Sequence, residues 1–184
     1  MINKILSMMK KEYRLKSLDA GVFHKLVVRG MDFEINSYEA VGIGRVATMC
    51  ASGLLGLIKR DILIISPMEK DAAVVSYERV RSFGKDTVIL SRCDLVNDVQ
   101  FIKEVGKKKE KEELDAKVES YFTEYLSELR AADNADVITR KPVVDELVEA
   151  YLLGGNLISD IFMATYGGTI TRKLYHGVLF GTRE

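Results

Sequence analysis

Apolar side chains recur every three or four residues over the last third of the chain, from residue 118 to residue 181. This spacing places them on one face of successive helices. Pro142 suits the first helical position of one helix, and Thr169 suits the N-cap of the last one. The pattern predicts a C-terminal helical layer, which we bound at residues 103–181.

Short apolar and β-branched segments separated by turn residues fill residues 31–95. Ile62–Ile65 is an apolar run that ends at Pro67, and Val74–Arg81 has the composition of a further strand. The connections are too short for the helical crossovers that parallel strands need. We therefore predict an antiparallel strand meander, although residues 45–59 fit either a strand or a helix.

The first segment, residues 1–18, is predicted as an amphipathic helix. Its apolar residues share one face, and Lys4, Lys11 and Arg14 share the opposite face. An ordinary surface helix explains this pattern, and a basic face also suits an acidic partner. Together the segments predict an α+β protein, with residues 1–184 forming a single domain.

Composition narrows the class of protein. The 27 basic and 27 acidic residues balance, which is atypical of a strongly basic nucleic-acid binder. Two cysteines and two histidines lie far apart, so we expect no metal site. The uncharged stretch 46–58 is shorter than the roughly 17 apolar residues of a membrane span. We expect a soluble cytoplasmic protein without a membrane span.

Glu78 is the carboxylate with the most unusual surroundings, because it lies inside an apolar, β-branched strand. Strand alternation puts Glu78 on the same face as Ser76 and opposite Tyr77. A carboxyl group that faces a pocket has its pKa raised by desolvation and is able to act as a general acid. The alternative is a solvent-facing glutamate paired with a basic residue on a neighbouring strand.

Two further patterns admit ordinary explanations. Gly42–Ala47 matches a dinucleotide-binding fingerprint, which requires a buried strand before it and a helix after it. The residues before it are polar for such a strand, so a glycine turn is the alternative to a nucleotide site. The two histidines, His24 and His176, show no spacing typical of a catalytic triad, and we interpret His176 as a partly exposed structural residue.

The order of several segments is similar to that of the ferredoxin-dependent bilin reductases and the related red chlorophyll catabolite reductases. Ile62–Pro67 leads into Val74–Val80, and Thr87–Leu90 is followed by Asp94-Leu95. The end of the chain, Tyr166–Phe180, resembles the terminal helix of that family. The chain departs from the family in having Glu78 where Asp is usual, and in having no histidine on the strand before Pro67.

The resemblance implies an α/β/α sandwich with a central antiparallel sheet and a tetrapyrrole pocket between the sheet and the C-terminal helices. It implies reduction of the ligand with electrons from ferredoxin, without flavin, metal or a covalently bound cofactor, and with Glu78 as the proton donor. Ser76, Tyr77 and Tyr175 are then candidate ligand-binding residues. A small acidic redox protein would bind the basic face formed by Lys4, Lys11 and Arg14. A non-catalytic ligand-binding or interaction domain is the alternative function.

Overall fold

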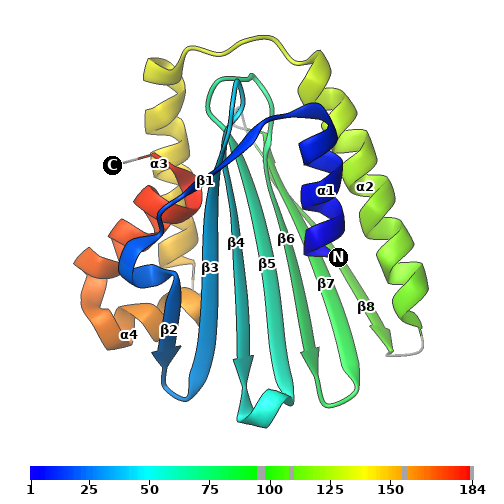
Figure 1. Cartoon of the computed structure of the whole chain (residues 1–184), viewed down its shortest axis with the longest axis vertical. Coiled ribbons are helices and arrows are strands. Elements are labelled where there is room, and N and C mark those ends of the chain that lie inside the picture. Colours follow the sequence, from blue (N-terminus) through cyan, green and yellow to red (C-terminus); the bar gives the residue numbers. More distant parts are fainter. Residues whose placement is uncertain (95–97, 108–109, 155–156, 183–184) are drawn as a thin grey trace.

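A computed structural model describes residues 1–94, 98–107, 110–154 and 157–182, in which one large sheet carries helices on both faces (Figure 1). The strands are β1 (Leu15–Leu18), β2 (Lys25–Val28), β3 (Met31–Ala40), β4 (Gly44–Gly53), β5 (Ile58–Pro67), β6 (Val74–Ser82), β7 (Lys85–Asp94) and β8 (Asp98–Lys107). The longer helices are α1 (Ile2–Glu12), α2 (Lys111–Ala131), α3 (Val137–Leu153), α4 (Leu157–Arg172) and the π-helix η4 (Lys173–Phe180), and short 3₁₀ turns are η1 (Gly21–Phe23) and η2 (Leu54–Gly56).

The sheet is an antiparallel meander, as the sequence predicts. Strands β3 to β8 follow one another in space, and both β1 and β2 pair with β3. Residues 45–59, which fitted either a strand or a helix, belong mainly to β4, whose register with β3 runs from Met31 opposite Gly53 to Ala40 opposite Gly44. The predicted α+β sandwich with a central antiparallel sheet is confirmed.

Alternation along the strands divides the core into two layers. Helices α1 and α2 pack on one face of the sheet, where Tyr77 and Phe122 are fully buried. Helices α3, α4 and η4 pack on the other face, which we call the C-terminal face, where Phe33 and Phe162 meet edge to face at 5.1 Å. Burying each side chain of this size contributes about 1.5–3 kcal/mol, so both layers stabilise the sheet.

Two predicted boundaries are wrong because strand pairing overrides the helical pattern. The N-terminal helix ends at Glu12 rather than near residue 18, since Leu15–Leu18 pairs with β3 as β1. Arg14 consequently lies beyond the helix. The helical layer begins at Lys111, because residues 103–107 pair with β7 as part of β8.

The two helix starts predicted at Pro142 and Thr169 differ from those in the structure. Pro142 lies inside α3, which begins after Asp136, whose side chain accepts a hydrogen bond from the backbone N–H of Ile138. Thr169 lies within α4 rather than capping a new helix, although the helical backbone is interrupted two residues earlier, at Gly167.

Within the described ranges, no single helix is long and apolar enough to cross a membrane. Helices α3 and α4–η4 together have sufficient length and apolar composition, but they are bent by 87° against each other.

Candidate functional site

Glu78 lies on the C-terminal face of β6 and is only 9% exposed. Ile62 of β5 and Ile89 of β7 are its cross-strand neighbours. The guanidinium Nε of Arg60, on β5, donates a hydrogen bond to Oε1 of Glu78. The structure therefore combines both interpretations of this residue: the carboxyl is largely buried beneath the helical side of the sheet, and it is paired with a basic residue on the adjacent strand.

Tyr175, on η4, lies close enough to the Arg60–Glu78 pair for both charges to act on its hydroxyl. Burial raises the pKa of Tyr175 well above its ordinary value, the nearby Tyr151 raises it further, and Arg60 acts in the opposite direction. The ring packs at 5.9 Å from that of Tyr151, which fixes η4 against α3. Tyr175 therefore lies between the C-terminal helices and the ion pair on the sheet.

The structure separates the other two candidate ligand-binding residues. Ser76 is half-buried on the same face of β6 as Glu78. Tyr77 points to the opposite face, where it packs in the α1–α2 core with its ring 6.5 Å from that of Phe122, and burial raises its pKa to about 12. Ser76, Glu78 and Tyr175 therefore lie on the C-terminal face of the sheet, and Tyr77 does not.

Beyond β5, the helices cover the C-terminal face less completely. A strip of side chains on β6 and β7 is half-buried, in contrast to the closed core over β4 and β5. We call it the open strip, and it consists of Ser76, Val80, Thr87, Ile89 and Ser91. The Arg60–Glu78 pair borders this strip, and its mixture of hydroxyl and apolar side chains suits a flat, largely apolar ligand with a few polar groups.

A second cluster, centred on His176, joins the C-terminal helices. His176 is 1% exposed, so its interpretation as a partly exposed residue is wrong. Its Nδ1 lies 2.8 Å from Asp145 Oδ1 and 2.8 Å from Thr182 Oγ1, and its Nε2 lies 2.8 Å from Glu149 Oε1. Arg172 also donates to Glu149, from Nε to both carboxylate oxygens at 2.9 and 3.1 Å and from Nη2 to Oε2 at 3.0 Å. Hydrogen bonds from Arg172 and then His176 lower the pKa of Glu149 to about 2.

This cluster has a structural role that sequence reasoning missed. It links η4 to α3 and therefore holds Tyr175 in place beside Glu78. The available signal was the pair Asp145 and Glu149, which lie four residues apart and share one face of a helix with many apolar residues.

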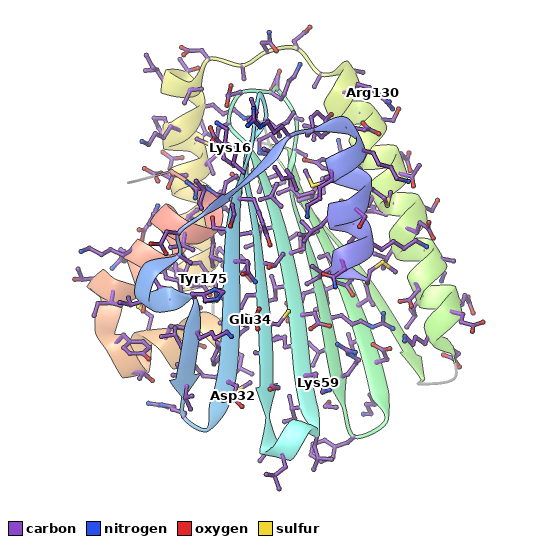
Figure 2. All side chains as sticks on the ribbon, in the orientation of Figure 1. Lys16, Asp32, Glu34, Lys59, Arg130 and Tyr175 are labelled. Atoms are coloured by element: carbon purple, nitrogen blue, oxygen red, sulfur yellow. The ribbon has the colours of Figure 1, made fainter. Side chains whose placement is uncertain are left out.

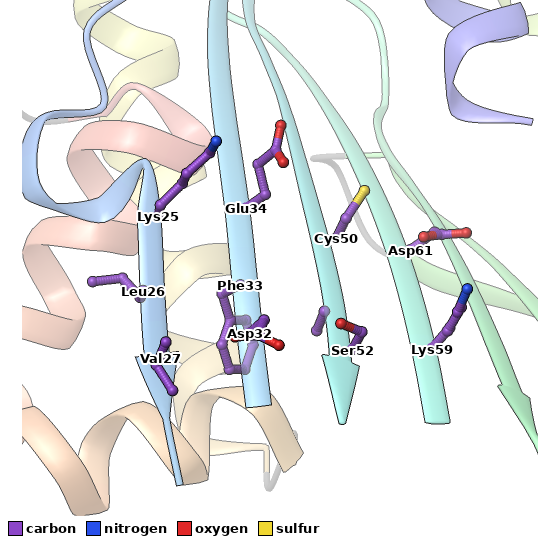
Figure 3. A pocket seen from close by; sticks show the side chains of 11 residues that line it. Lys25, Leu26, Val27, Asp32, Phe33, Glu34, Cys50, Ser52, Lys59 and Asp61 are labelled. Carbon is purple, nitrogen blue, oxygen red and sulfur yellow. The ribbon is translucent and has the colours of Figure 1, made fainter. Parts of the chain in front are cut away.

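Pockets in the described part of the chain lie away from Glu78, and two of them are relevant here. One, of about 510 Å³, opens on the part of the α1–α2 face that the helices leave uncovered, and Lys25, Glu34, Cys50 and Asp61 line it (Figure 3). Partial burial, followed by the carboxylates Asp61 and Glu34, raises the pKa of Cys50 to about 11, which favours an unreactive thiol. The other pocket, of about 670 Å³, lies between β4 and η4 and is lined by Arg45, Asp19, Arg172 and His176 among others.

Gly42–Ala47 forms the turn and first residues of an antiparallel hairpin. The nucleotide-binding alternative is wrong, because β4 follows the glycines where a helix N-terminus would be needed. Gly44 instead permits close packing: a Cβ atom there would lie 2.4 Å from the backbone oxygen of Ser66. Among residues 1–94, 98–107, 110–154 and 157–182, no group of three His, Cys, Asp or Glu side chains is arranged to hold a metal ion.

Comparison with known proteins relates the chain to others by structure alone. No family model and no curated protein sequence matches it. Selenomethionine-labelled phytochromobilin synthase from tomato, solved in complex with biliverdin, aligns with a TM-score of 0.74 over 98% of this chain and 82% of that chain. The chain has a bilin-reductase-like fold. Sequence identity is 11%, so the likeness shows the fold and leaves the ligand and the reaction to be inferred from the site.

Proposed function

We propose that the protein binds a linear tetrapyrrole or a similar planar apolar ligand on the C-terminal face of the sheet, beside Glu78. The observation that carries this proposal is the position of the largely buried Arg60–Glu78 pair, which faces the C-terminal helices of a fold shared with a biliverdin-bound protein. The open strip supplies an adjacent surface on which a flat ligand can lie. Tyr175 then contacts the ligand from the helical side.

In the catalytic form of the proposal, Glu78 donates a proton during reduction of the ligand. Reduction of one double bond consumes two electrons and two protons. A small acidic redox protein of the ferredoxin type supplies the electrons, Glu78 supplies one proton, and solvent supplies the other and reprotonates Glu78. A carboxyl group positioned in this way contributes typically 10²–10⁴-fold to the rate of a proton-transfer step.

The ion pair with Arg60 determines when Glu78 can act as a proton donor. The guanidinium now donates to the carboxylate, and a protonated Glu78 would no longer form an ion pair with it. A ligand carboxylate, such as a tetrapyrrole propionate, is a suitable replacement because arginine binds carboxylates with strong, directional hydrogen bonds. The proposal therefore assigns two roles to the pair: Arg60 binds an acidic substituent of the ligand, and Glu78 donates the proton.

The docking of an electron donor on the N-terminal basic face is part of the same proposal. Lys4 forms an ion pair with Glu119 of α2 at 2.6 Å, and Lys11 and Arg14 are exposed. This surface belongs to the α1–α2 side of the sheet, whereas Glu78 belongs to the C-terminal side. Replacing Lys11 and Arg14 by glutamate tests this docking site. The variant should receive electrons from the donor more slowly, and its affinity for the ligand should be unchanged.

Titration of the purified protein with biliverdin, followed by addition of reduced ferredoxin, tests the function. We expect a shifted absorption band on binding and bleaching on reduction. Glu78→Gln should retain the band and lose the bleaching, and Glu124→Gln, at an exposed position on α2, is the matched control. Binding without bleaching in the unaltered protein would favour the non-catalytic alternative, and absence of any spectral change would contradict tetrapyrrole binding.

A further inference from the structure

Three hairpin turns lie along the same end of the sheet, opposite the β3–β4 turn (Figure 1). They comprise residues 28–31 between β2 and β3, residues 53–59 between β4 and β5, and residues 82–85 between β6 and β7. We call this group the hairpin end. The second and third turns are neighbours, because β5 pairs with β6.

The backbone of the hairpin end has an unusual conformation. Arg29, Leu54, Leu55 and Phe83 have φ angles of 50°, 48°, 55° and 47°, and within the described ranges they are all of the non-glycine residues with positive φ. The left-handed region is unfavourable for leucine and phenylalanine, and glycine or asparagine normally occupies it. Turns that served only to reverse the chain would use those residues, so the large side chains point to a contact function.

The side chains at these turns are exposed and apolar. Phe83 is 74% exposed, Leu55 is fully exposed, and Leu54 and Leu57 are each more than half exposed. Single apolar residues on a surface are ordinary, but several large ones gathered on adjacent loops are typical of an interaction site.

The exposed charge of the hairpin end is mainly basic, although the whole chain is neutral. Arg29, Lys59 and Lys85 are exposed there, and the exposed acid Asp32 lies level with Lys59 across β3 and β4. Lys59 lies at this end, two residues after the exposed Leu57 (Figure 2). Apolar loop tips surrounded by basic side chains are complementary to a surface that combines anionic headgroups with an apolar interior.

We propose that the hairpin end binds peripherally to a membrane that contains anionic lipids. Leu54, Leu55 and Phe83 enter the boundary between headgroups and acyl chains, and the basic side chains contact the headgroups. A lipid surface fits better than a protein partner, because the apolar side chains stand on separate turns, whereas a protein interface requires one continuous, closely complementary patch. This inference is independent of the proposed ligand site.

Vesicle co-sedimentation of the full chain tests the proposal. Vesicles of phosphatidylcholine alone are compared with vesicles containing equal parts of phosphatidylcholine and phosphatidylglycerol. We expect binding to the second kind, weakened by added salt. Leu55→Ser should reduce the partition coefficient about tenfold, because the transfer free energy of one leucine corresponds to at least that factor. Lys59→Gln should cause a smaller loss that disappears at high salt.

The matched control is Leu153→Ser, which removes a leucine that is 75% exposed at the end of α3 and belongs to none of the three turns. It should leave vesicle binding unchanged. Leu55→Gly gives a second measurement: because glycine adopts positive φ readily, the melting temperature should not fall, while vesicle binding should weaken as much as in Leu55→Ser. The proposal is overturned if the unaltered protein stays in the supernatant with anionic vesicles, or if Leu55→Ser and Leu153→Ser bind equally well.

Discussion

Breaking the Arg60–Glu78 pair on one side should cost far more stability than removing both charges together. In Arg60→Met, the carboxyl group of Glu78 loses its partner in a position that is only 9% exposed, between Ile62 and Ile89. Removing one partner of a buried ion pair typically costs about 3–5 kcal/mol. The side chains of this pair retain some contact with solvent, so we expect about 3 kcal/mol, at the lower end of that range.

The double variant Arg60→Met/Glu78→Leu should be nearly neutral, because apolar replacements of similar size avoid the desolvation of both charges. Urea unfolding of the two single variants and the double variant measures the coupling free energy directly. Additive losses in the double variant would refute the reasoning, since they would show that the two side chains do not interact. A neutral double variant that no longer binds the ligand would indicate that the pair is kept for function rather than for stability.

Three further predictions concern other parts of the molecule. Gly44→Ala should lower stability by about 1–3 kcal/mol, because its Cβ would collide with the Ser66 carbonyl, whereas Gly42→Ala, at a glycine with open space around it, should cost less; thermal unfolding compares them. Since the pKa of Glu149 is lowered from 4.5 to about 2, its contribution to stability should be complete above about pH 4.5 and lost as the pH falls toward 2, and Glu149→Gln should flatten this part of a plot of urea midpoint against pH. Cys50, whose pKa is raised to about 11, should react slowly with iodoacetamide at neutral pH, and Asp61→Asn should accelerate the reaction.

The fold was largely predictable because its signals are local. Strands β5, β6 and β7 contain β-branched runs between turn residues, and the stripes of α2 to η4 have the helical period. Residues 45–59 were ambiguous because alanine, glycine and methionine have no strong preference for a strand. Strands β1 and β2 were missed because each has only four residues, and β8 was missed because its last residues, 103–107, begin a segment dense in lysine and glutamate, which suits an exposed helix equally well.

The candidate site was predictable only in part. Alternation around Glu78 correctly placed Ser76 on its face and Tyr77 on the other. The partnership with Arg60 depends on the register between β5 and β6, which no local pattern specifies. His176 likewise takes its partners from α3, about 30 residues earlier in the chain, so its burial follows from helix packing rather than from its own sequence neighbours.

The absorption spectrum of the protein mixed with biliverdin, recorded before and after reduced ferredoxin is added, tests the central claim most directly. If Glu78 is the proton donor, biliverdin should bind to both the unaltered protein and Glu78→Gln and show a shifted absorption band in both. Bleaching should follow in the unaltered protein alone. Equal bleaching of the two proteins would remove Glu78 from the chemistry. An unchanged biliverdin spectrum in both would contradict the proposed tetrapyrrole binding.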